Sequence, residues 1–114
     1  MSGWIGVDLD GTLAKYDGWR GMHHIGDPVG PMFSRVVQWL KEGKEVKIFT
    51  ARVAVSNEDD RNHIIDAIQN WCVKHGLPKL PVTNEKDFGM VELWDDRAVQ
   101  VVPNTGKRVD GADR

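Results

Sequence analysis

Residues 4–13 of the 114-residue chain read WIGVDLDGTL, an apolar run that ends in two carboxylates, a glycine and a hydroxyl. A run of strand length that does not alternate apolar with polar residues predicts a β-strand buried on both faces, as in a parallel sheet. Asp8 and Asp10 follow at its carboxyl end, the edge where open α/β sheets bind ligands, so we expect both to point into a crevice. Two carboxylates this close repel each other unless a cation lies between them, and their hard oxygens favour Mg²⁺.

Length and composition limit the chain to one domain with one layered core. The formal net charge of −2 gives no general attraction to nucleic acid or to a membrane surface. Cys72 is the single cysteine, and its place on the apolar face of an expected helix indicates a buried thiol. The sequence shows neither an apolar signal segment nor a long apolar span, so we expect a cytoplasmic protein.

Strand and helix signals alternate after the first strand. The order of these signals predicts an α/β fold with a parallel sheet and right-handed crossovers. We expect helices at 31–42 and 57–75, from apolar residues at helical spacing between a start and a glycine stop. The expected strands lie at 45–50, 80–83 and 90–94, with a short fifth at 98–102.

The loop after the first expected strand carries two candidate catalytic residues for phosphoryl transfer. Asp8 can attack phosphorus and form an aspartyl-phosphate. Asp10, two residues further on, can protonate the leaving oxygen and later activate water. Gly11 and Thr12 close the same loop, and we expect them to contact the substrate.

The second and third strands end in residues suited to binding a phosphate. Thr50 can donate its hydroxyl to a phosphoryl oxygen, together with the backbone N–H groups of Ala51 and Arg52. Lys86 places a positive charge near the same oxygens and Asp8. Taken singly, Thr50 is equally a strand-end cap and Lys86 a solvated lysine.

The fourth strand ends in Asp95 and Asp96, which add carboxylates for Mg²⁺. We expect Asp95 to bind the metal directly and Asp96 to lie behind it. A turn with a surface ion pair is the alternative interpretation of this pair. The order of polar groups at four successive strand ends favours one joint site.

This ordered set resembles the four motifs of the haloacid dehalogenase (HAD) superfamily, over residues 4 to about 102. The resemblance implies a Rossmann-like (HAD-like) three-layer sandwich with a mainly parallel sheet of about five strands. It also implies phosphatase activity through an aspartyl-phosphate, and Mg²⁺ held by Asp8, the backbone carbonyl of Asp10 and a last-motif aspartate. The matching residues are Asp8-Leu9-Asp10-Gly11-Thr12, Thr50, Lys86 and Asp95-Asp96.

Residues 14–30 are predicted to form a flap over the first strand end, because this long segment carries aromatic and basic residues that a linker would lack. Members of the superfamily often have a cap domain, but this chain resembles the small capless type. We expect a catalytic domain at 1–103 and a polar tail at 104–114. Trp19 and Arg20 are candidates for substrate binding, with packing of Trp19 on the sheet as the alternative.

We therefore expect a Mg²⁺-dependent phosphomonoesterase, with a phosphorylated substrate as partner and no membrane association. A nucleotide or nucleic-acid end phosphatase is the alternative within the same family, since aromatic side chains of the flap can stack on bases. A non-catalytic phosphoacceptor or binding module is the alternative from another class. Receiver domains also combine paired acids, an acceptor Asp, Thr and Lys. The position of Asp10, two residues after the candidate acceptor, argues against this alternative, because receivers carry the acid pair on the first strand and the acceptor on a later one.

Overall fold

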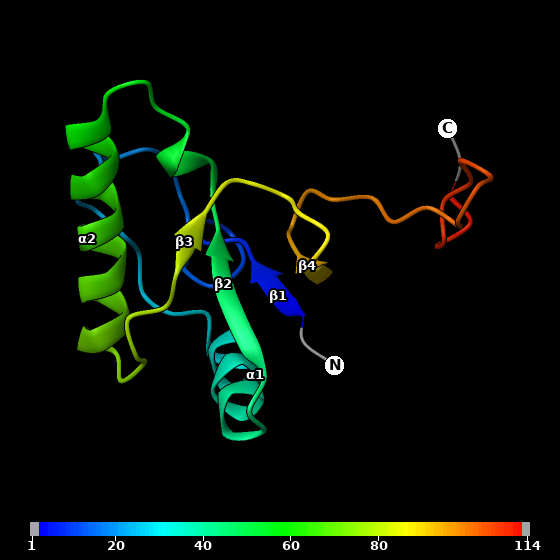
Figure 1. Ribbon diagram of the computed structural model, residues 1–114, viewed down its shortest axis with the longest axis horizontal. Coiled ribbons are helices and arrows are strands. Elements are labelled where there is room, and N and C mark those ends of the chain that lie inside the picture. The colour runs from blue at the N-terminus through cyan, green and yellow to red at the C-terminus, as the bar shows by residue number, and fades with distance from the viewer. Residues whose placement is uncertain (1–2, 113–114) are drawn as a thin grey trace.

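Four parallel strands form the centre of the computed structural model, which describes residues 3–112. In chain order the elements are β1 (Trp4–Val7), α1 (Gly30–Lys41), β2 (Glu45–Phe49), the 3-10 helix η1 (Ala51–Val53), α2 (Glu58–Lys74), β3 (Val82–Thr83) and β4 (Met90–Trp94). The order across the sheet is β3-β2-β1-β4, so the first strand lies inside the sheet (Figure 1). All three strand pairs are parallel. The expected α/β fold with a parallel sheet is confirmed.

All four residues of β1 are buried, as the sequence predicts for its apolar run. The strand has a neighbour on each edge, and its side chains alternate between the two faces. Ile5 and Val7 point to one face, Trp4 and Gly6 to the other. A Cβ atom on Gly6 would lie only 3.0 Å from the Met90 Cε atom, so the glycine lets side chains of β4 approach β1 closely.

α1 begins at Gly30 and has Pro31 in its first turn. Proline is well suited to this position, because the backbone N–H groups of the first turn have no partner within the helix. The helix ends at Lys41, and Gly43 then takes a left-handed φ of 80°. Both ends agree with the prediction from sequence.

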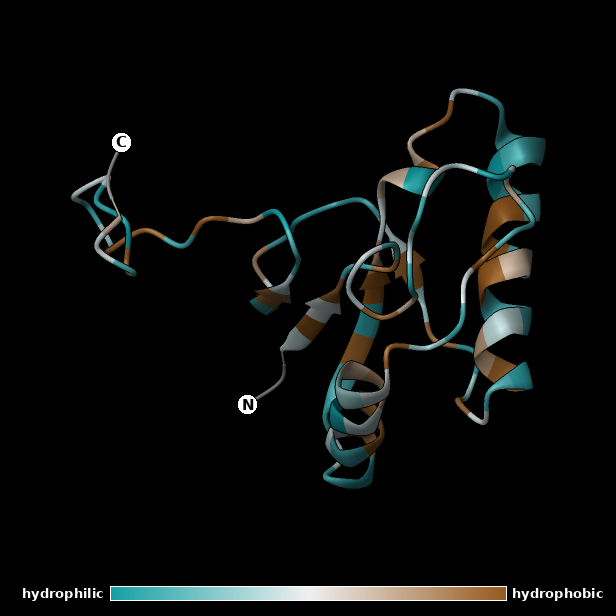
Figure 2. Ribbon diagram, turned by 180° about the vertical axis from the view of Figure 1, so that it is seen from behind, coloured by the Kyte–Doolittle hydropathy of each residue, from teal (hydrophilic) through white to brown (hydrophobic). Residues whose placement is uncertain are grey.

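α2 is capped by Asn57, whose side chain accepts a hydrogen bond from the Asp60 backbone N–H at 3.1 Å. Acidic residues fill its first turn, where negative charge is favourable. Hydrophobic (brown) and hydrophilic (teal) segments alternate along its ribbon, as expected for a helix with one buried side (Figure 2). Its buried residues are Ile64, Ile68, Trp71 and Cys72. Within residues 3–112, neither helix combines the length and the apolarity that crossing a membrane requires.

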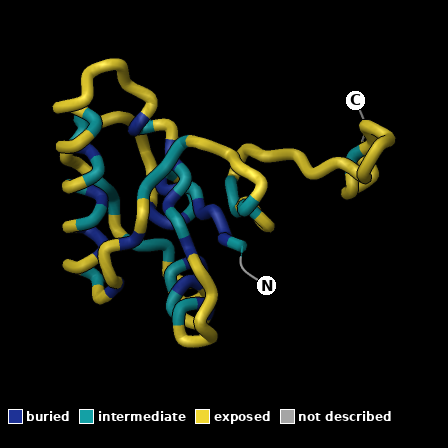
Figure 3. The backbone as a smooth tube through the Cα atoms, viewed as in Figure 1, coloured by how far each residue is buried: buried dark blue, intermediate teal, exposed yellow. Residues whose placement is uncertain are grey.

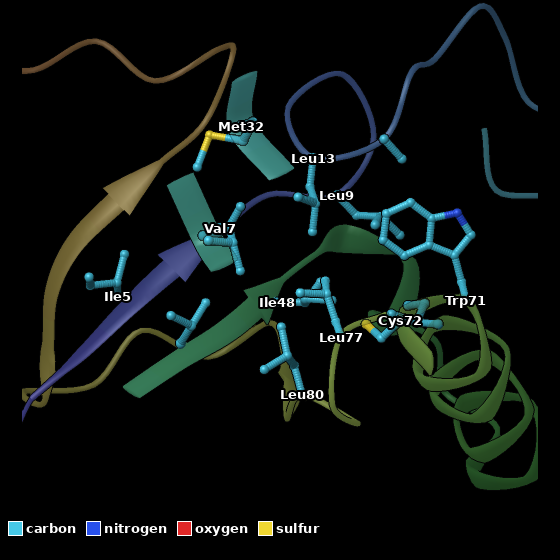
Figure 4. Close-up of a cluster of buried hydrophobic side chains, with 14 of the residues drawn as sticks. Ile5, Val7, Leu9, Leu13, Met32, Ile48, Trp71, Cys72, Leu77 and Leu80 are labelled. Carbon is cyan, nitrogen blue, oxygen red and sulfur yellow. The ribbon is translucent and has the colours of Figure 1, made fainter. Parts of the chain in front are cut away.

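One apolar core joins both helices to the same face of the sheet (Figure 4). Its strand residues are Ile5, Val7, Val46 and Ile48. Leu9 and Leu13 extend the core beneath the loop after β1, and both are completely buried. Burial of these two leucines fixes the loop that carries the candidate catalytic carboxylates.

The opposite face of the sheet carries no helix within residues 3–112 (Figure 1). Trp4 is buried there by its neighbours: the Lys47 Nζ atom lies 4.6 Å from a ring centroid, and the indole N–H donates to Asp87 Oδ1 at 2.9 Å. The third layer of the expected sandwich is therefore not built by a helix in the described residues. The strands and helices still form the expected Rossmann-like arrangement.

The expected fifth strand at residues 98–102 does not join the sheet. This segment leaves the sheet as an exposed arm that ends in a small hairpin (Figures 1 and 3). The chain reverses at Asn104 and Gly106, whose φ angles are 64° and 71°, and the Val102 N–H donates to the Lys107 carbonyl at 2.8 Å. Because the segment pairs with its own continuation, the sheet of residues 3–112 has four strands in place of about five.

Candidate active site

The carboxyl ends of the strands meet at one edge of the sheet, where the structure has a pocket of about 750 Å³. Asp8 and Asp10 line it from the loop after β1, and Thr50 lines it from the end of β2. Asp95 and Asp96 line it from the end of β4. The structure thus brings together five residues that the sequence predicts for one site.

Packing of Trp94 positions the two acidic residues that follow it, Asp95 and Asp96. Its backbone carbonyl accepts a hydrogen bond from the Asp8 N–H at 2.9 Å, which extends the pairing of β1 and β4 by one residue. Its ring meets Trp39 of α1 edge-on, with a centroid separation of 5.2 Å. Asp95 and Asp96 follow directly, so they are held beside the loop after β1.

Asp8, Asp95 and Asp96 form an acidic cluster, in which one carboxylate oxygen of each lies within 4.8 Å of the others. The Thr12 hydroxyl joins the two loops: it lies 3.4 Å from Asp8 Oδ2 and 3.3 Å from Asp96 Oδ1, and it accepts from the Asp96 N–H at 3.1 Å. Gly11 adopts a φ of 87°, and a Cβ there would lie 2.7 Å from Asp96 Oδ2. Gly11 and Thr12 therefore shape the cluster itself.

Burial raises the pKa of Asp8 from 3.8 to about 7, and a side-chain hydrogen bond with Asp96 and the charges of Asp95 and Asp96 act in the same direction. A cation among the three oxygens would remove this repulsion. Hard carboxylate oxygens at this spacing are suitable ligands for a divalent ion such as Mg²⁺. The three acids therefore fit the metal that the sequence predicts, whereas the Asp10 side chain lies outside their cluster.

We expect the raised pKa of Asp8 to make the metal-free protein less stable as the pH rises. The folded chain binds this proton more tightly than the unfolded chain, so the stabilisation is complete below pH 3.8 and is lost as the pH rises to about 7. In thermal melts at pH 8 with EDTA, Asp8→Asn should therefore raise the Tm by about 4–8 °C, and by much less at pH 4. Mg²⁺ should raise the Tm of the natural protein at pH 8. Asp66→Asn, on the exposed side of α2, is the matched control, and equal shifts in both variants would refute the assignment.

Thr50 is almost completely buried, with 2% of its surface exposed. Its hydroxyl oxygen accepts a hydrogen bond from the Arg52 N–H at 3.1 Å, which caps η1. The cap occupies an oxygen lone pair and leaves the hydroxyl hydrogen to donate. Ala51 also lines the pocket. The cap and the phosphate-binding interpretations of Thr50 are therefore compatible.

Arg52 forms a bidentate ion pair with Asp10, with its Nε 2.7 Å from Oδ2 and its Nη2 2.8 Å from Oδ1. The Arg52 side chain is 6% exposed and that of Asp10 is 20% exposed, so the pair is largely shielded from water. Arg52 also donates to the backbone carbonyl of His24 at 2.9 Å. One guanidinium thus connects the loop after β1, the end of β2 and residues 14–30, a role that no pattern in the sequence indicates.

Residues 14–29, which belong to the expected flap, lie between the loop after β1 and α1, and backbone hydrogen bonds fasten the base of this segment. The Lys15 N–H donates to the Asp27 carbonyl at 2.8 Å, which closes the base of the segment. The Trp71 indole of α2 donates to the Gly26 carbonyl at 2.9 Å. A side chain on Gly26 would collide with the Lys15 carbonyl, so a glycine is required where the two ends of the flap approach.

The two candidate binding residues of the flap differ in position. Trp19 lines the pocket, and the Arg52 guanidinium carbon lies 4.9 Å from a Trp19 ring centroid. Trp19 therefore packs on Arg52 rather than on the sheet. Arg20 does not line the pocket, and its guanidinium pairs with Asp17 at 2.8 Å.

Lys86 does not line the pocket either. It lies in a separate hollow along the outer side of β4, together with Glu92 and Asp95. The cations among the residues lining the pocket are Arg52 and Arg97. The positive charge in the pocket, which we expected from Lys86, therefore comes from these two arginines.

The sequence-based prediction missed several residues that line the pocket. Arg97 directly follows the acidic pair, and Asn84 directly follows β3, so their position at strand ends was a usable signal. The apolar members carried no comparable signal. They are Tyr16, Met22, Phe49, Ala54, Val55 and Ile64.

Comparison with known proteins gives a match of fold. Neither a family model nor a curated protein matches the chain. A solved structure described as that of a conserved protein coded by a locus from Bacteroides thetaiotaomicron is similar, with a TM-score of 0.61 and 18% sequence identity over 91% of this chain and 84% of that chain. At this identity the likeness concerns the fold alone: the chain is an α/β protein with a small parallel sheet.

Proposed function

We propose that this protein is a Mg²⁺-dependent phosphomonoesterase that works through an aspartyl-phosphate on Asp8. The observation that carries the proposal is the cluster of Asp8, Asp95 and Asp96, with oxygens within 4.8 Å of one another in a pocket that also contains Asp10. An acidic cluster alone would suit only a cation. A second carboxylate in the same loop, held apart from the cluster by an arginine, adds a group for proton transfer.

The first half of the reaction transfers the phosphoryl group to the protein. An Asp8 carboxylate oxygen forms a bond to phosphorus while the bond from phosphorus to the ester oxygen breaks. The leaving oxygen takes the proton of Asp10 and departs as the alcohol. A bound Mg²⁺ would supply positive charge that offsets the repulsion between the carboxylate and the phosphate.

The second half releases phosphate. A water oxygen attacks phosphorus, and Asp10, now ionised, accepts a proton from that water. The bond between phosphorus and the Asp8 oxygen breaks, so inorganic phosphate leaves and the Asp8 carboxylate is restored. The proton that Asp10 gave in the first half is replaced in the second, and the cycle closes with one water consumed.

Arg52 must give up part of its contact with Asp10 during this cycle. Both Asp10 oxygens accept hydrogen bonds from Arg52, so neither is free to carry a proton to the leaving oxygen. A phosphate dianion entering the pocket competes for the same guanidinium, whose planar donors suit phosphate as well as carboxylate. Substrate binding would therefore free one Asp10 oxygen at the moment when it is needed.

The test is hydrolysis of the phosphomonoesters p-nitrophenyl phosphate and ribose 5-phosphate with and without divalent metal. We expect sustained turnover that EDTA reduces to the uncatalysed rate and that excess Mg²⁺ restores. Ca²⁺ should inhibit, because its higher coordination number lets it occupy both oxygens of Asp8. Hydrolysis that survives EDTA would contradict the proposal, and a single stoichiometric acyl-phosphate without turnover would indicate a phosphoacceptor module instead.

A further inference from the structure

We infer that the preferred substrate is a free nucleoside monophosphate, whose base lies against Trp19 in the apolar part of the pocket. This inference rests on the proposed phosphatase function and adds the class of alcohol that carries the phosphate. Three features support it: the size and composition of the pocket, the fixed position of Trp19, and the polar groups available for a base.

The pocket is larger than a phosphate group requires. Its volume of about 750 Å³ is within the range of about 300–1,000 Å³ that is typical of sites enclosing whole small molecules. The carboxylates of Asp8, Asp95 and Asp96 come from the loops after β1 and β4. The remaining wall comes from the flap and from the segment after β2, which lies on the other side of β1. The space beyond the phosphate is therefore available to the alcohol.

This remaining wall is apolar and open to solvent. Exposed fractions are 47% for Tyr16, 59% for Trp19 and 40% for Val55, and all three side chains line the same pocket. Large apolar side chains left exposed around a concave surface are typical of ligand sites, because covering them with a ligand releases ordered water. A sugar phosphate alone would cover them with hydroxyl groups, whereas a flat ring covers them with apolar area.

Trp19 is held in place before any ligand binds. Its ring rests on the Arg52 guanidinium at 4.9 Å, and Arg52 is in turn fixed by Asp10 and by the His24 carbonyl. A cation against an aromatic ring stabilises this arrangement. Because the ring is already oriented, stacking a base against it costs little side-chain entropy.

The pocket also offers polar groups for the edge of a base. Asn84 lines the pocket, and its amide can donate to and accept from a base. Arg97 lines it as well and adds further donors. Binding a nucleic-acid backbone needs several unpaired cations in a row, but one cation of the flap, Arg20, is paired with Asp17, and the formal net charge of the chain is −2. These features favour a single nucleotide over a nucleic-acid end.

The test compares AMP and UMP with ribose 5-phosphate, in which the leaving oxygen is the same and the base is missing. In the Mg²⁺-loaded protein we expect kcat/KM to be about 10- to 100-fold higher for the nucleotides. Trp19→Leu should remove most of this preference by raising KM for the nucleotides, with little change for ribose 5-phosphate. Trp19→Phe, which keeps an aromatic ring, should retain most of it. His23→Ala, exposed on the same flap and outside the pocket, is the matched control.

Equal kcat/KM values for AMP and ribose 5-phosphate would overturn the inference while leaving the phosphatase function intact. A higher value for a 5′-phosphorylated oligonucleotide than for AMP would overturn the assignment to free nucleotides. If p-nitrophenyl phosphate and the sugar and nucleotide esters are not hydrolysed at all, the phosphatase function fails, and calorimetric binding of AMP against ribose 5-phosphate decides by itself whether the base site exists. Tighter binding of AMP that is lost in Trp19→Leu would support the base site, and equal binding would refute it.

Discussion

Asp8→Asn should abolish turnover, with a loss on the order of 10⁴-fold or more in kcat for every phosphate ester. A neutral amide is too weak a nucleophile to attack phosphorus and form the acyl phosphate, so the covalent step is lost. The same change removes one of the three carboxylates of the acidic cluster, so the apparent affinity for Mg²⁺ should fall as well. The measurement is kcat for ribose 5-phosphate and p-nitrophenyl phosphate at saturating Mg²⁺, with Mg²⁺ titrated separately by calorimetry.

The fold of this variant should remain intact, because asparagine is nearly the same size as aspartate and relieves the repulsion that raises the Asp8 pKa. Asp66→Asn applies the same chemical change on an exposed position of α2 and should keep the natural rate. Activity of Asp8→Asn within tenfold of the natural protein would remove Asp8 from the role of nucleophile. A second readout is acid-stable trapping of labelled phosphate, which should be seen in the natural protein and be absent from the variant.

Asp10→Asn should lose on the order of 10²–10⁴-fold in kcat for an alkyl ester such as ribose 5-phosphate. The loss should be much smaller for p-nitrophenyl phosphate, because its leaving oxygen is acidic enough to depart without a proton. Burst kinetics with this aryl ester should then show rapid release of nitrophenol followed by slow release of phosphate, since Asp10 also activates the water in the second half.

Loss of the ion pair with Arg52 is the main alternative explanation for such a result. Arg52 holds the flap through the His24 carbonyl, so Asp10→Asn could also loosen the flap. Arg52→Lys serves as the control: a lysine ammonium cannot form the bidentate contact, yet it leaves the Asp10 carboxyl in place. Proton transfer is assigned to Asp10 if two results are obtained together. Arg52→Lys should lower kcat equally for the alkyl and the aryl ester, and Asp10→Asn should lower it much more for the alkyl ester. Equal losses of Asp10→Asn on both esters would exclude that role.

The Arg52 contacts also connect the candidate site with the flap. Within residues 3–112, the flap is fastened by α2 through Gly26 and by Arg52 through His24. Under the proposed function, movement of the Arg52 guanidinium toward a phosphate would weaken its contacts with Asp10 and with the His24 carbonyl, so substrate binding would also affect the flap.

Local signals determined the elements that form the centre of the molecule. The apolar run before Asp8 could only be a buried strand, because it lacks the alternation of a half-exposed one. Pro31 and Gly43 limited α1, and Asn57 limited the start of α2, since each acts through the backbone of its own turn. These choices depend on neighbours within a few residues, which a sequence displays directly.

The meeting of Asp8, Thr50, Asp95 and Asp96 was also predictable, although these residues are far apart in the chain. Parallel strands place all their carboxyl ends at one edge, so a residue that follows a strand is located as soon as the strand is recognised. The same reasoning failed for Lys86, which is three residues beyond the end of β3 and turns to the outer side of β4. The end of a strand predicts the position of the next one or two residues. Beyond them, the conformation of the loop determines where a side chain lies.

Only the tertiary structure decided how the charges pair and which segments close on themselves. Arg52 pairs with Asp10 because η1 lies beside the loop after β1, and no spacing in the sequence encodes that contact. Residues 98–102 have the composition of a strand. The turn at Asn104 and Gly106 nevertheless folds the following residues back onto them, so they pair with this continuation and not with β4 at the edge of the sheet. Composition gives a segment its preference for pairing, and the partner that lies closest in space determines which pairing forms.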